Sequence, residues 1–88
     1  MALNRATREF VGVDAQIDSA YDFDPTVVMV ERVSDGTNVR LIIWQISTGS
    51  AVNPGSGTTY DAAPLGSVFI DNVGLHYRKA AASTWTSF

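Results

Sequence analysis

The chain has 88 residues, a formal net charge of −3, no cysteine and a single histidine. This length supports one domain, and a domain of this size buries only about 60–65% of the surface that its unfolded chain exposes. Small domains usually gain the missing stability from disulfides, metal ions or partner chains. A disulfide is excluded here, and one histidine is too few for a structural zinc site. Association with other chains remains, and a charged fraction of only 17% favours it.

The charge pattern excludes several other classes of protein. Nine acids stand against six bases, and no basic stripe of the kind that binds nucleic acid is present. The longest aliphatic run, residues 41–44, is far shorter than the roughly 18 residues of a membrane span. The two arginines near the start are not followed by the apolar segment of a secretory signal. We therefore expect a soluble protein that is assembled inside a cell, without nucleic acid or membrane as a partner.

The first predicted strand spans residues 10–17, where Val11, Val13, Ala15 and Ile17 alternate with other residues. This period of two is typical of a half-buried strand. Residues 1–9 have few apolar side chains and are predicted to form an N-terminal arm outside a single β domain of residues 10–88. Alternatively, the arm is simply disordered. If it is ordered by a neighbour, Arg5 and Arg8 are its candidate contacts with an acidic surface.

Residues 26–46 predict a β-hairpin with Asp35-Gly36 at the centre of its turn, because a type I′ turn needs positive φ at both central positions. This turn sets a register in which Glu31 lies opposite Arg40 and apolar residues lie opposite one another. Both faces of the hairpin are then apolar, whereas a free antiparallel sheet usually has one polar face. Either a second sheet and a loop enclose the hairpin, or one face is a subunit interface. The interface reading makes four residues candidate oligomer contacts: Val27, Met29, Ile42 and Trp44.

Residues 47–64 are rich in Gly, Ser and Thr, with Tyr60 as their one large anchor. Such a long loop is either mobile on the surface or ordered by a partner. A second hairpin is predicted over residues 66–79, with residues 71–74 as its turn and Ile70 opposite Leu75. Residues 80–83 could form a helical turn, and residues 84–88 are predicted to form a last strand whose Trp85 packs on the core.

No catalytic or metal-binding motif is present. His76 lies in a predicted strand, and Ser67 and Ser83 lack the surroundings of a nucleophile. The acids at 14, 18, 22 and 24 do not have the spacing of a calcium loop, so a solvated or partner-facing edge is favoured over cation binding. Residues 55–57 lack the Gly-Lys-Ser/Thr ending of a phosphate loop. We therefore expect no enzyme activity, no metal and no cofactor.

Three segments near the end of the chain carry a resemblance. Residues 64–70 begin with a Pro-x-Gly-Ser motif, residues 74–79 read Gly-Leu-x-Tyr-x-Lys, and residues 84–86 read Thr-Trp-Thr. This combination resembles a short module of tailed-bacteriophage virion proteins. The resemblance covers residues 64–86 and implies a structural protein located in the virion and assembled in the host cytoplasm.

Together these patterns predict an all-β fold, a small antiparallel sandwich or barrel of about six strands with an N-terminal arm and a long Gly/Ser-rich loop. The resemblance implies a capsid decoration (cement) protein, bound to the major capsid protein or another virion protein and homo-oligomeric, with a trimer favoured. One alternative is a tail, fibre or head-tail adaptor component in which exposed aromatic rings bind host glycan, namely those of Tyr60, Tyr77, Trp85 and Phe88. Another is a monomeric cellular binding module. The candidate interface residues are Val27, Met29, Ile42, Trp44, Arg5, Arg8, Tyr60 and Trp85.

Overall fold

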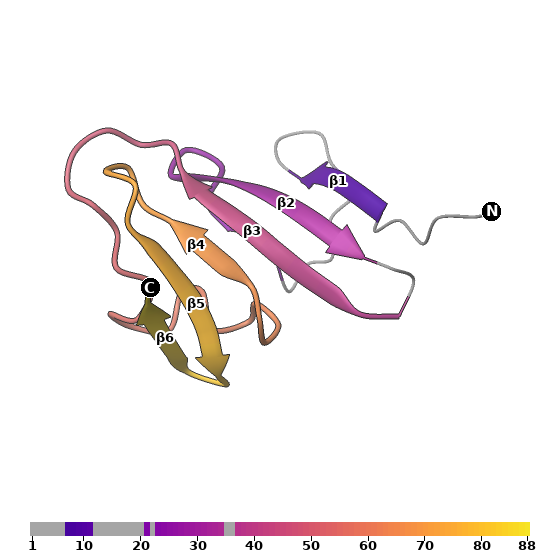
Figure 1. Ribbon diagram of the computed structural model, residues 1–88. Coiled ribbons are helices and arrows are strands. Elements are labelled where there is room, and N and C mark those ends of the chain that lie inside the picture. Colours follow the sequence, from indigo (N-terminus) through magenta and orange to yellow (C-terminus); the bar gives the residue numbers. More distant parts are fainter. Residues whose placement is uncertain (1–6, 12–20, 22, 35–36) are drawn as a thin grey trace.

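The computed structural model describes residues 7–11, 21, 23–34 and 37–88. Within these ranges the chain forms strands and no α-helix, which confirms the predicted all-β class. All the described strands belong to a single sheet in the order β1-β2-β3-β4-β5-β6 (Figure 1). The sheet is mixed and not purely antiparallel as predicted, because β3 and β4 run parallel. The strands are β1 Thr7–Val11, β2 Val28–Ser34, β3 Val39–Gln45, β4 Val68–Ile70, β5 His76–Ala81 and β6 Thr84–Ser87.

The first strand begins earlier than predicted. β1 pairs with β2, with Thr7 opposite Ser34 and Val11 opposite Val30. Residues 7–9 therefore belong to the sheet and not to an arm. The remainder of the predicted first strand, residues 12–17, lies outside the described residues, and so does Arg5.

The hairpin of β2 and β3 forms where it was predicted but in a different register. The partner of Glu31 is Ile42 and not Arg40, so the predicted Glu31–Arg40 pair is wrong. Ser34 lies opposite Val39, so residues 35–38 connect the strands in place of a two-residue turn. The partner of Glu31 moves from residue 40 to residue 42, a shift of two. Because side chains alternate between the two faces of a strand, a shift of two leaves every residue on its predicted face.

A long crossover joins β3 to the parallel strand β4. Figure 1 shows the chain leaving β3 at one end of the sheet and returning to the other end before β4 begins. Residues 46–67 make this connection, which we call the crossover loop. Tyr60 and Ala63 of this loop are buried in the core, and Val52 packs against it. The one large anchor of the loop is thus used within its own domain, and contact of the loop with a partner stays a prediction.

Gln45, at the end of β3, holds the start of the crossover loop. Its side chain is 7% exposed, and Nε2 donates hydrogen bonds to the Ser50 carbonyl and the Ser47 hydroxyl, both at 3.0 Å. Its Oε1 accepts from the backbone N–H of Val52 at 2.8 Å and of Asn72 at 3.2 Å. One buried amide therefore joins the crossover loop to the β4–β5 loop, and its own polar groups are satisfied.

The second hairpin also forms in a shifted register. Ile70 lies opposite His76 and Phe69 opposite Tyr77, so the predicted pair of Ile70 with Leu75 is wrong. The buried carboxylate of Asp71 accounts for the longer loop, because its Oδ1 accepts hydrogen bonds from the backbone N–H of Val73 at 3.0 Å and of Leu75 at 2.8 Å. Gly74 adopts a φ of +89°, which an L side chain rarely adopts.

The end of the chain is a strand pair with no helical turn. β5 continues to Ala81 with a register shift between Lys79 and Ala81, so the predicted turn at residues 80–83 is wrong. β6 follows as the predicted last strand. Its Trp85 is 8% exposed, which confirms that this ring packs on the core.

The core lies between the sheet and the crossover loop, with Phe69 of β4 at its centre. The Phe69 ring is fully buried and contacts three other rings, those of Tyr60 at 5.0 Å, Trp85 at 6.3 Å and Tyr77 at 6.4 Å between centroids. Phe23 extends the cluster by packing on Tyr60 at 5.0 Å. Edge-to-face and tilted contacts of this kind are favoured by the quadrupoles of the rings. The sheet thus has one face covered by its own chain, and a sandwich or barrel is not formed by the described strands.

Candidate functional site

A row of side chains crosses the sheet from β2 to the residue after β6. Met29 lies opposite Trp44, Trp44 is level with Ile70 of the parallel strand, and Ile70 lies opposite His76. The backbone N–H of Phe88 donates to the His76 carbonyl at 3.0 Å, and the two rings are 5.9 Å apart. We call this set the cross-strand row: Met29, Trp44, Ile70, His76 and Phe88.

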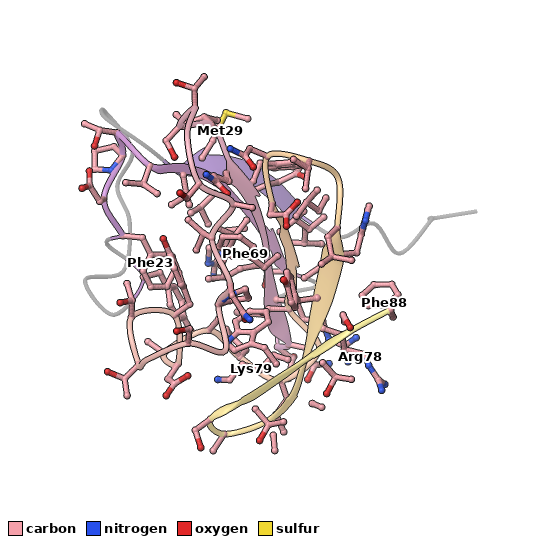
Figure 2. The ribbon with its side chains drawn as sticks, turned by 90° about the vertical axis from the view of Figure 1, so that its left-hand side faces the viewer. Phe23, Met29, Phe69, Arg78, Lys79 and Phe88 are labelled. Atoms are coloured by element: carbon pink, nitrogen blue, oxygen red, sulfur yellow. The ribbon has the colours of Figure 1, made fainter. Side chains whose placement is uncertain are left out.

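The cross-strand row lies on the side of the sheet opposite the crossover loop. In Figure 2, Phe23 and Lys79 lie on one side of the sheet, and Arg78 and Phe88 lie on the other. We call this second side the open face. Met29 is 40% exposed and Phe88 68% exposed, while Trp44 and Ile70 are half-buried. Large contiguous apolar patches mark interaction sites on proteins, whereas single exposed apolar side chains are ordinary surface.

The exposed charges described on the open face are basic. Arg40 and Arg78 occupy the same face as Ile42 by strand alternation and register, and both are exposed. The guanidinium of Arg40 lies over Gly66, where a Cβ would be only 2.9 Å from Cζ. Glu31 belongs to the same face and is buried. The open face therefore carries the cross-strand row, and the guanidinium groups of Arg40 and Arg78 lie to one side of that row.

The structure separates the predicted interface residues into groups. Met29, Ile42 and Trp44 share the open face. Val27 precedes β2 and packs against the core. Tyr60 and Trp85 are buried at 6% and 8% exposure and belong to the core, so the structure gives their predicted contact with a partner no support. Arg8 lies in β1 opposite Val33, and Arg5 is outside the described residues.

Burial corrects the expectation that four aromatic rings are exposed. Tyr60, Tyr77 and Trp85 are at most 9% exposed, and their rings pack around Phe69. Of the four aromatic residues proposed to bind glycan, only Phe88 is exposed. The expectation that these four rings form an exposed cluster is therefore wrong, and glycan binding itself stays a prediction.

Sequence reasoning missed the part of the row contributed by β4, β5 and the end of the chain. Ile70, His76 and Phe88 join Met29 and Trp44 only through the parallel pairing of β3 with β4. No short-range motif predicts a parallel pair, because its strands are joined by a crossover and not by a turn. The sequence contained one indication of where Ile70 would lie. Side chains alternate along a strand, so Val68 and Ile70 share a face and Phe69 lies on the other.

Lys79 is a buried base with a clear structural role. It is 3% exposed, and Nζ donates hydrogen bonds to the backbone carbonyls of Asp61 at 2.5 Å and Ala63 at 2.6 Å. The ammonium group also lies 5.9 Å from the centre of the Trp85 ring, within reach of a cation–π interaction. Lys79 thus attaches the crossover loop to β5.

The residues considered for catalysis have structural partners. Ser67 is fully buried, and its hydroxyl accepts a hydrogen bond from the backbone N–H of Leu41 at 2.9 Å. His76 contacts the Gly74 carbonyl through Nδ1 at 2.9 Å. Among the described residues, no three His, Asp or Glu side chains are placed to hold a metal ion. The described segments also include no helix that could span a membrane.

Asp24 is the one member of the predicted acidic series that the structure describes. Its Oδ1 accepts hydrogen bonds from the hydroxyl of Thr26 at 2.7 Å and from the Thr26 backbone N–H at 2.9 Å. These bonds hold the pKa of Asp24 below its ordinary value of 3.8. The carboxylate stabilises the turn before β2, and Asp14, Asp18 and Asp22 lie outside the described residues.

The buried ring of Tyr60 predicts a loss of stability in alkaline solution. Burial, with a smaller contribution from the negative charge of Asp24, raises the pKa of Tyr60 above its ordinary value of 10.0. The folded chain therefore holds the phenol proton more tightly than the unfolded chain. Stability from Tyr60 is full below about pH 10 and falls as the pH rises from there through the folded pKa. Urea unfolding at about pH 8 and about pH 11 should show a smaller alkaline loss for Tyr60→Phe than for wild type. Equal losses would contradict the raised pKa.

Comparison with known proteins gave no match to a family model, to a curated protein or to a solved structure.

Proposed function

We propose that this chain is a structural protein of a tailed-phage virion, which acts through contacts between protein subunits and not through catalysis. The observation that carries the proposal is the cross-strand row, in which Met29, Trp44, Ile70 and Phe88 form an apolar strip on the open face. Apolar strips on a sheet are normally covered. The resemblance of residues 64–86, which contain β4, β5 and most of β6, to virion modules supplies the biological setting.

Within the virion, the proposed role is that of a capsid decoration protein. A small chain with few charges and one apolar face suits a subunit that stabilises a shell by contact, assembled in the host cytoplasm on the major capsid protein or another virion protein. The finer fold proposal, a sandwich, then requires its second sheet from a neighbouring subunit. A tail, fibre or head-tail adaptor component is the alternative within the same setting. Its glycan-binding form has less support, since Tyr60, Tyr77 and Trp85 are buried.

This proposal predicts that the chain is a constituent of virus particles and that Trp44 is needed to keep it there. Particles purified from cells that encode the chain should contain it by mass spectrometry. Particles assembled with Trp44→Ser should retain much less, since a tryptophan at the centre of an interface commonly contributes at least a tenfold effect on affinity. Leu65→Ser is the matched control, because it removes an exposed apolar side chain outside the cross-strand row. Particles that lack the wild-type chain would rule the proposal out.

A further inference from the structure

We draw no further inference here: the strongest candidate, the apolar cross-strand row on the open face of the sheet, carries nothing further because nothing in the part of the chain that the structure describes shows what covers it.

Discussion

Replacement of Lys79 by Met should destabilise the fold by about 2–4 kcal/mol, because the variant keeps the aliphatic stem and loses the ammonium group. In the variant, the backbone carbonyls of Asp61 and Ala63 lose the Lys79 ammonium group as their shared hydrogen-bond donor. Both carbonyls then remain near the core without that donor. A hydrogen bond to a charged group contributes more than a neutral one, and a buried acceptor left without a partner adds a desolvation cost. The free energy of unfolding from urea titration by circular dichroism is the measurement.

The neighbouring residue provides the control for this substitution. Arg78 is exposed on the opposite face of β5, so Arg78→Met makes a similar chemical change outside the core. Its effect on the free energy of unfolding should stay within about 0.5 kcal/mol, measured at a protein concentration at which both variants are monomeric. Equal destabilisation by the two substitutions would show that the ammonium of Lys79 does not hold the crossover loop.

Replacement of Phe69 by Ala should cost about 3–5 kcal/mol of stability, the largest effect that we expect from removing an apolar side chain. The ring is fully buried, and its loss leaves a cavity among Tyr60, Tyr77 and Trp85. A chain of this length has a total stability of about 4–13 kcal/mol, so the variant could be largely unfolded. Near-ultraviolet circular dichroism of the aromatic cluster and urea unfolding measure the outcome.

A milder substitution keeps this prediction testable if Phe69→Ala does not fold. Phe69→Leu retains an apolar side chain and should cost less than Phe69→Ala, as substitutions that conserve more of the volume do. Leu65→Ala removes an exposed apolar side chain and should change stability by no more than about 0.5 kcal/mol. A Phe69→Ala effect as small as that of Leu65→Ala would contradict the central position of this ring.

The β2–β3 hairpin shows which part of a fold can be predicted from local sequence. The apolar runs around residues 35–36 correctly placed both strands, and alternation correctly placed Met29, Ile42 and Trp44 together on one face. The register was wrong because cross-strand matching of side chains does not decide it. In the observed register only two pairs are apolar on both strands, Met29 with Trp44 and Val30 with Ile43, and Glu31 lies opposite Ile42. The Glu31–Arg40 pair was the discriminating feature, and a cross-strand charge pair contributes under about 1 kcal/mol.

The second hairpin failed for a different reason. Its loop is closed by the side chain of Asp71, which binds two backbone N–H groups, and composition alone does not show which carboxylate will do this. The extent of the open face could not be predicted either. It depends on the parallel pairing of β3 with β4, a contact between segments separated by the whole crossover loop. The sequence therefore predicted the part of the cross-strand row that β2 and β3 contribute. It did not predict the part contributed by Ile70, His76 and Phe88.

The short parallel contact between β3 and β4 has a consequence for how the chain folds. It joins two meanders, β1-β2-β3 and β4-β5-β6, each built from strands that are neighbours in sequence. The β2–β3, β4–β5 and β5–β6 pairs close only short loops, whereas the contact between the meanders requires closure of the crossover loop, residues 46–67, at a higher entropic cost. We expect the two halves to become structured first and the rate of folding to be set by their docking. Residues 42–44 and 68–70, the seam between the halves, would then acquire their native contacts last.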